Sequence, residues 1–158
     1  MNPPVNLWKL SCSLHQKKIT YLAKILKALN FFIFKTILPY EAEFEPDISL
    51  EHYALGVVIH PNVTLGKGVK IYHGVTLATS TWIGSPYRIF IEDNVVIGAN
   101  ATIISRENTS LRIGRGAKIG AGAVVTRDVA PGAVMVGVPA KDIKTHDREL
   151  AIELAIYE

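Results

Sequence analysis

The chain of 158 residues contains one cysteine, Cys12, so it can form no disulfide within itself. A single thiol suits a reducing compartment, and we expect a cytoplasmic protein. Long hydrophobic runs are also missing, because the most apolar stretch, residues 28–38, is interrupted by Asn30 and Lys35. That stretch is too short to span a bilayer. The amino end shows no secretory signal, so neither export nor a membrane-spanning helix is predicted.

Acidic residues are missing from the first 40 positions, which carry six lysines and no arginine. The whole chain has a net charge of +3, so the remainder is acidic on balance. Lysines scattered among aliphatic residues, without arginine forks for phosphate recognition, do not favour a nucleic-acid-binding arm. We therefore predict no nucleic-acid partner. Hydrophobic residues at 49% and charged residues at 20% are typical of a folded globular chain.

The sequence does contain a six-residue period. Ten positions, arranged in three runs, all carry isoleucine, leucine or valine, and eight of them are followed four residues later by valine or alanine. The ten first positions are Ile59, Leu65, Ile71, Leu77, Ile91, Ile97, Ile103, Ile113, Ile119 and Val125. A period of six fits a short strand and a turn that return a side chain to one interior spot. We predict a stacked solenoid with a thin aliphatic core; a sandwich of short strands is the alternative.

This pattern, over roughly residues 37–143, resembles the hexapeptide-repeat acyltransferases. The resemblance implies an all-β fold, a left-handed parallel β-helix with a short N-terminal helical segment and a C-terminal helix. The handedness comes from the resemblance alone, because parallel crossovers are otherwise right-handed. We expect an N-terminal helical arm over 1–38, the β-helix over 39–140 and a tail over 141–158, with a short helix over 146–157.

The N-terminal arm is predicted to form two helices over residues 7–38, ended by Pro39. Apolar residues at helical spacing make a wide face between Ile19 and Phe34, and Lys18, Lys24 and Lys27 lie opposite. We expect this arm to pack on the solenoid and cap its exposed strands. The alternative is peripheral contact with an anionic membrane surface. Further along the chain, two excursions, residues 78–90 and 104–112, interrupt the period and are expected near a binding face.

His52 is the residue expected to carry chemistry. It interrupts the period at a bulge, beside Glu51, and transfer of an acyl group to a hydroxyl needs a base with a pKa near neutrality. Residues 50–58 resemble the segment of serine acetyltransferases that holds their catalytic histidine after an aspartate. That resemblance implies His52 as general base, with Glu51 in place of the aspartate. The other histidine of interest, His73, lies in a regular hexad and reads either as a hydrogen-bonding surface residue or as an acceptor-binding one.

The resemblance to serine acetyltransferases has departures. The second acid of that family's catalytic dyad falls on Ile37, and its serine-binding arginine–histidine pair falls on Tyr87 and Arg88. The glycine-rich loop is replaced by residues 78–81, and the large N-terminal helical domain is missing. The short arm, the chain length and the run over 72–76 look more like O-acetyltransferases of capsule, colanic acid and lipopolysaccharide assembly. We therefore expect a sugar hydroxyl as acceptor, bound with help from His73 and Arg88, with serine as the alternative.

The acetyl donor is expected along residues 119–129 and 137–141, where small side chains would let a pantetheine arm lie against the coils. The family's coenzyme A contacts match Ala99, Ala121, Thr126, Arg127 and Lys141, and acetyl-CoA is the implied co-substrate. No cysteine–histidine spacing suggests a metal, and no serine or cysteine lies in a nucleophile elbow. We therefore predict direct transfer, without a metal.

Three further expectations complete the prediction. The family habit and the few walls of one solenoid favour a homotrimer with active sites between subunits. A γ-carbonic anhydrase would need three zinc-binding histidines, and His52, His60 and His73 lack that family's spacing. A non-catalytic assembly scaffold remains the alternative from a different functional class, and coenzyme A binding would argue against it.

Overall fold

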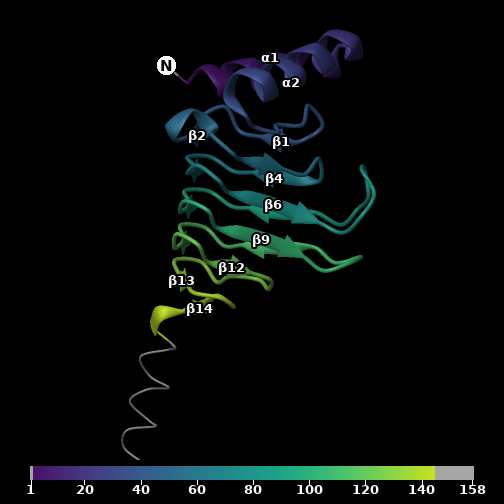
Figure 1. Ribbon diagram of the computed structural model, residues 1–158. Helices are drawn as coiled ribbons and strands as arrows, with labels where there is room; N and C mark the ends of the chain where they lie inside the picture. Colours follow the sequence, from purple (N-terminus) through teal and green to yellow (C-terminus); the bar gives the residue numbers. More distant parts are fainter. Residues whose placement is uncertain (1, 145–158) are drawn as a thin grey trace, which may run out of the picture.

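A computed structural model describes residues 2–144 as a left-handed parallel β-helix with two helices at one end (Figure 1). The fold class expected from the hexad pattern is confirmed. The coils follow one another in sequence order from the helical end to the last strand pair (Figure 1). The helix expected over 146–157 lies outside the described residues, and the division of the chain at residues 38 and 140 stays a prediction.

Three sheets form the sides of the β-helix. The first contains β1 (Glu43–Phe44), β4 (Val63–Leu65), β7 (Ile89–Ile91) and β10 (Leu111–Ile113). The second contains β2 (Ser49–Leu50), β5 (Lys70–Ile71), β8 (Val96–Ile97), β11 (Lys118–Ile119), β13 (Val134–Val136) and β14 (Lys141–Asp142). The third contains β3 (Val58–Ile59), β6 (Thr76–Thr79), β9 (Thr102–Ser105) and β12 (Val124–Val125). Neighbouring strands are parallel, except that β13 and β14 are antiparallel.

The hexad positions form the core of the stack. All ten predicted first positions are buried, with at most 2% of the side chain exposed. Strand register places like residues above one another: Ile71 pairs with Ile97, and Ile97 pairs with Ile119. Burying a side chain of this size stabilises the fold by about 1.5–3 kcal/mol before entropy is counted. The six-residue period therefore arises because each coil contributes one buried side chain to the core from each of its three sides.

Two excursions leave the stack where one sheet turns into the next. The longer one covers residues 80–88 between β6 and β7 and extends sideways from the coils (Figure 1). Buried Asn62 organises it: its amide nitrogen donates to the Trp82 carbonyl (2.8 Å) and its oxygen accepts from the Gly84 N–H (2.8 Å). Ile89 is buried in β7, whereas Ile83 is exposed. The excursion is therefore shorter than the 78–90 expected from the sequence.

Helix α1 (Pro3–Gln16) covers the first coil of the solenoid. It begins with prolines, which suit the first helical turn because their missing N–H has no partner to lose. Its own residues Val5, Trp8 and Cys12 are buried and form part of the hydrophobic core. The Trp8 indole N–H donates to the Pro39 carbonyl at 2.7 Å, which ties the helix to the chain entering the stack. This is the cap expected of the N-terminal arm.

Helix α2 (Thr20–Phe34) is oriented opposite to the expectation. Only Ala23 and Asn30 of this helix are buried, and the wide apolar face points outward. The small inward residues let α2 approach α1 closely: Ser11 donates to the Ala23 carbonyl (2.8 Å) and Asn30 donates to the Pro4 carbonyl (3.2 Å). The helix ends at Phe34, with Lys35 in the left-handed region, so Pro39 is not what stops it.

Cys12 provides a test of the α1 packing. Burial raises the pKa of its thiol to about 12, and the thiolate is the reactive form. At pH 8 the native protein should therefore react with an aromatic disulfide reagent far more slowly than the protein unfolded in guanidinium. Absorbance of the released thiol measures both rates. Fast labelling of the native protein at this pH would mean that α1 does not cover the first coil.

Candidate active site

His52 lies in a turn of unusual backbone conformation. The 3-10 turn from His52 to Ala54 has three consecutive residues with positive φ, at 51°, 56° and 58°. The left-handed conformation costs about 1–2 kcal/mol for each residue other than glycine. Such strain persists only where surrounding contacts enforce it, and it clusters at functional sites. Here buried Ala54 anchors the turn to the core, while His52 remains exposed.

A second histidine meets His52 from the next coil. The Nδ1 atoms of His52 and His73 lie 2.8 Å apart, so one ring donates and the other accepts a hydrogen bond. His73 follows β5, and the N–H of its neighbour Gly74 donates to the Leu55 carbonyl at 2.8 Å. Tyr72 packs edge-on against the His52 ring. Because the pair uses Nδ1, Nε2 is the His52 nitrogen that could receive a proton from an acceptor.

Glu51 has a different partner. Its carboxylate accepts a hydrogen bond from the Ser49 hydroxyl at 2.7 Å. The side chain that contacts the His52 ring through a hydrogen bond is His73. Ile37, at the position of the family's second acid, is partly exposed and joins the stack through a bridge to Val58. The catalytic role expected for Glu51 stays a prediction.

Ala99 and Ala121 lie in the same column of turns as His73. The Asn100 N–H donates to the His73 carbonyl (2.9 Å), and the Gly122 N–H donates to the Ala99 carbonyl (2.8 Å). These turns join the second sheet to the third in successive coils. The two predicted donor-binding alanines are thus placed in line with the histidine pair.

The remaining predicted donor residues come together further along the stack. Thr126, Arg127 and Lys141 share a cavity of about 370 Å³ formed by the turn after β12 and the β13–β14 hairpin. The hairpin is held by the Ala140 N–H, which donates to the Val124 carbonyl at 2.8 Å. Arg127 and Lys141 suit an anionic group such as a nucleotide phosphate, but Asp128 and Asp142 also line the cavity, so its lining carries as many acids as bases.

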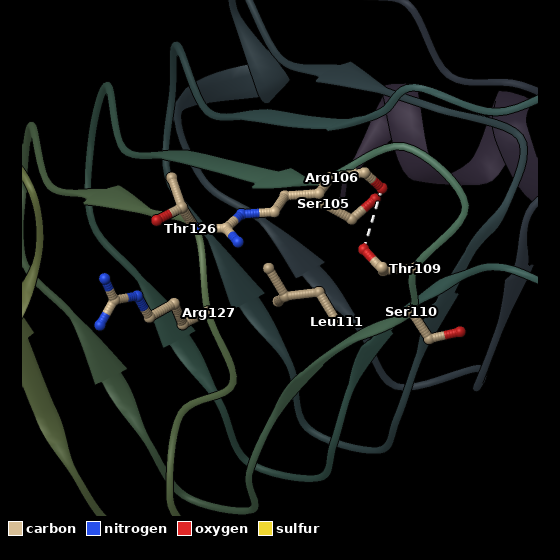
Figure 2. Close-up of a pocket in the computed structure, with 7 residues that line it drawn as sticks. All are labelled: Ser105, Arg106, Thr109, Ser110, Leu111, Thr126 and Arg127. Atoms are coloured by element: carbon tan, nitrogen blue, oxygen red, sulfur yellow. Dashed lines mark hydrogen bonds between the residues drawn. The ribbon is translucent and has the colours of Figure 1, made fainter.

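A neighbouring cavity of about 290 Å³ shares Thr126 and Arg127 with the first and lies at the excursion over 104–112, which was expected near a binding face (Figure 2). Arg106 belongs to the excursion after β9, and its guanidinium group extends toward Thr126 (Figure 2). Thr109 donates to the Arg106 carbonyl at 3.0 Å and closes the excursion. The break in the period indicated this region, but no sequence signal singled out Arg106 within it.

Arg88 is placed away from the histidine pair. It lies just before β7, where its guanidinium group contacts Glu43 (3.4 Å), Thr64 (3.1 Å) and the Val63 carbonyl (3.2 Å). These partners belong to the first sheet and its edges, whereas His52 and His73 lie between the second and third sheets. Its predicted acceptor-binding role stays a prediction.

An apolar groove beside His52 was also missed. A cavity of about 340 Å³ is lined by His52, Tyr53, Leu55 and, from the end of α2, Ile33 and Phe34. The Phe34 and Tyr53 rings stack with centroids 6.4 Å apart. No local sequence signal connects residues 33–34 to residue 52, because the helical arm reaches this corner only through the tertiary fold.

His60, the remaining histidine of the solenoid, has a structural place. Its Nδ1 accepts a hydrogen bond from the Asn62 N–H at 3.0 Å, and burial lowers the pKa of its ring. Within residues 2–144, no three histidine, cysteine or acidic side chains gather as metal ligands. Nor does either helix in the described part of the chain have the length and hydropathy needed to cross a bilayer.

Comparison with known families and proteins agrees with this geometry. Residues 88–127 match the family model described as the hexapeptide repeat of succinyl-transferase. A serine acetyltransferase from Helicobacter pylori is 33% identical over 141 residues, covering 89% of this chain and 79% of that protein. A serine acetyltransferase from Mycobacterium tuberculosis is 43% identical over 91 residues, covering 58% of this chain and 38% of that protein.

Solved structures give the same picture. The Neisseria gonorrhoeae serine acetyltransferase in complex with serine has a TM-score of 0.79 at 36% identity, covering 87% of this chain and 54% of that one. The Brucella abortus serine acetyltransferase in complex with coenzyme A has a TM-score of 0.80 at 28% identity, covering 88% and 54%. This chain therefore spans about half the length of those solved proteins.

The sugar acceptor expected from the sequence is wrong, and so is the assignment to polysaccharide synthesis. The Helicobacter pylori protein and the Neisseria gonorrhoeae structure, each matched over more than four fifths of this chain, are serine acetyltransferases. The sugar acceptor was expected from departures at Ile37, Tyr87, Arg88 and residues 78–81, and from the missing N-terminal helical domain. With four fifths of the Helicobacter pylori protein matched, the chain belongs to the serine acetyltransferase family of hexapeptide-repeat acyltransferases.

Proposed function

We propose that this protein transfers an acetyl group from acetyl-CoA to the hydroxyl of serine. The observation that carries the proposal is the match to a serine acetyltransferase across 79% of that relative's length. The exposed His52, held in a strained turn and hydrogen bonded to His73, supplies the base that such a transfer needs.

The reaction follows from the histidine pair. Nε2 of His52 takes the proton of the serine hydroxyl, and the oxygen forms a bond to the thioester carbonyl carbon. The carbon–sulfur bond then breaks, and the proton on His52 passes to the departing thiolate. An unactivated hydroxyl is a poor nucleophile, so proton removal is the step that the protein must assist. His73 orients the ring and stabilises it through the Nδ1 contact.

Acetyl-CoA is proposed to lie along the column of turns below His73. Ala99 and Ala121 leave space for the pantetheine arm beside the coils. Thr126, Arg127 and Lys141, which share one cavity, would then bind the nucleotide end through its phosphates. The column starts at the catalytic corner and continues toward that cavity, so the thioester would lie next to His52.

Serine also carries a carboxylate, which calls for a cation. Arg88 of the same chain contacts Glu43 at 3.4 Å and lies away from the histidine pair, so the cation must come from elsewhere. An assembly of three chains, with each site between two neighbours, would bring further walls to the exposed His52 corner. We propose such a homotrimer in the cytoplasm; light scattering that gives the mass of one chain would contradict it.

Membrane contact through the N-terminal arm is a separate proposal, because it depends on α2 and not on the reaction.

Removing the base should slow turnover without preventing donor binding. We expect His52→Asn to lower kcat by about 10²–10⁴-fold, the usual contribution of a positioned base. The KM for acetyl-CoA should change little, since His52 lies at the start of the column. His73→Ala should cost about tenfold or less in kcat, the value of one hydrogen bond. His73→Gln, which can still hydrogen bond, is the matched control and should recover most of that loss.

The assignment of the two histidines would be reversed by one result. If His73→Ala abolished turnover while His52→Asn retained it, the general base would be His73. Thiol release from acetyl-CoA, followed with a chromogenic reagent at saturating serine, measures both variants under the same conditions.

The donor site gives a second prediction. Arg127→Ala and Lys141→Ala should each raise the KM for acetyl-CoA by up to about fivefold, as expected for exposed charge pairs worth about 0.2–1 kcal/mol. The KM for serine should stay the same. Arg115→Ala, an exposed arginine at another corner, is the control. An unchanged acetyl-CoA affinity in the Arg127→Ala/Lys141→Ala double variant would place the donor elsewhere.

The acceptor itself is tested directly. Purified protein and acetyl-CoA should release thiol with serine at a rate far above that with threonine, homoserine or a panel of sugars. The product should be O-acetylserine by mass spectrometry. Turnover confined to a sugar, with serine inert at high concentration, would refute the proposed acceptor while leaving the histidine mechanism standing.

A further inference from the structure

The outward face of α2 is the largest feature that the proposed reaction does not use. It consists of Tyr21, Leu22, Ile25, Leu29 and Phe32, which follow helical spacing and are all exposed. Tyr21 and Phe32 are the most accessible, at 75% and 67%. Single exposed apolar residues need no explanation, but a contiguous helical face of this kind marks an interaction site.

The packing of α2 shows that this face is not left over from a poor fit. The inward side of the helix is small and polar, and both of its buried residues take part in contacts with α1. The apolar side of the helix therefore faces outward because its small, polar side packs on α1. The helix lies at the end of the stack, where the solenoid does not obstruct this face (Figure 1). A partner can approach this face without rearranging the fold.

The charges around the face identify the partner. Lys17 and Lys18 precede the helix and Lys35 follows it, whereas Lys24 and Lys27 lie with Phe31 and Phe32 around a cavity at one side of the helix. The first 40 residues contain no acid. A second copy presenting the same face would bring lysines against lysines, which is unfavourable at close range. An occupant must instead combine apolar groups with negative charge. An anionic phospholipid surface has both.

We propose that α2 docks on an anionic membrane surface, lying in its plane. At 15 residues the helix is too short to span a bilayer, but apolar side chains on one face and flanking lysines are typical of interfacial helices. Lysine stems can cover apolar surface while the ammonium groups reach the headgroups. Aromatic and aliphatic side chains of the face would enter the acyl boundary.

A cavity beside the face fits the same occupant. It measures about 440 Å³ and is lined by Lys24, Lys27, Ala28, Phe31, Phe32, Thr36 and Ile37. Its lining is mainly apolar, with two lysines at the edge, which matches a lipid headgroup phosphate above an acyl chain. The cavity is continuous with Phe32 of the outward face, so both would engage one leaflet together.

Vesicle binding of the full chain tests this proposal. The protein should co-sediment with vesicles of phosphatidylcholine and phosphatidylglycerol, and much less with phosphatidylcholine alone. Added salt should weaken the binding, because it screens charges near the surface. Lys17→Gln and Lys24→Gln should each lower partitioning about fivefold, the effect of about 1 kcal/mol per lysine. Phe32→Ser should lower it by about tenfold or more.

Matched controls separate α2 from general charge and hydrophobicity. Lys118→Gln, exposed on β11, and Ile83→Ser, exposed on the 80–88 excursion, should bind vesicles like the parent protein. Acetyl transfer to serine should be the same for all five variants, so failure of this proposal would not affect the proposed function.

Two outcomes would overturn it. The first is absence of binding to anionic vesicles, or binding that Phe32→Ser and the lysine variants leave unchanged. The second is a vesicle-free assembly, seen by light scattering, that Phe32→Ser dissociates, because a second copy of the chain would then occupy the face.

Discussion

Stacked registration of aliphatic side chains is the constraint on which the structure depends. Ile71, Ile97 and Ile119 lie one above another in successive coils because parallel strands hold their partners in fixed register. Inside the stack, a coil cannot gain or lose a residue without moving every later side chain out of the core. Extra residues are therefore accommodated only at the corners. The left-handed turn at His52 and the excursions over 80–88 and 106–110 all occur at corners. The candidate catalytic and binding residues lie at corners too.

The same constraint explains how much the sequence could reveal. The hexad frame predicted the solenoid and its buried positions, because each buried residue is set by its own short strand and repeats at a fixed interval. The left-handedness was expected from the family resemblance alone. The frame also located the bulge at His52, since a break in a strict period is visible without a structure. The period could not predict which side of α2 faces inward. Its apolar face was read correctly as a face, but the choice between burial and exposure depended on Ala23 fitting against α1.

The site residues also fall into two groups: those on the repeated turns of the coils and those placed by contacts between distant segments. Ala99 and Ala121 were named from the family resemblance and not from the period, and the structure stacks their turns on the turn of His73 through backbone hydrogen bonds. Arg88 could not be placed, since its position before β7 is set by an ion pair with Glu43 more than forty residues earlier in the chain. The groove formed with Ile33 and Phe34 depends on where the arm comes to rest. Contacts between distant segments leave no period to detect.

The two ends of the stack have a consequence for assembly. A parallel solenoid with bare ends offers unpaired backbone groups that another molecule can continue, and such edges lead to fibres. Here the first coil lies under α1, and the last parallel strand, β13, is followed by β14 running in the opposite direction. A reversed strand presents the wrong polarity for a further parallel coil. Addition of further molecules along the β-helix axis is thus discouraged at both ends. The three sheets that form the sides of the β-helix are then the surfaces through which copies can associate into a closed ring.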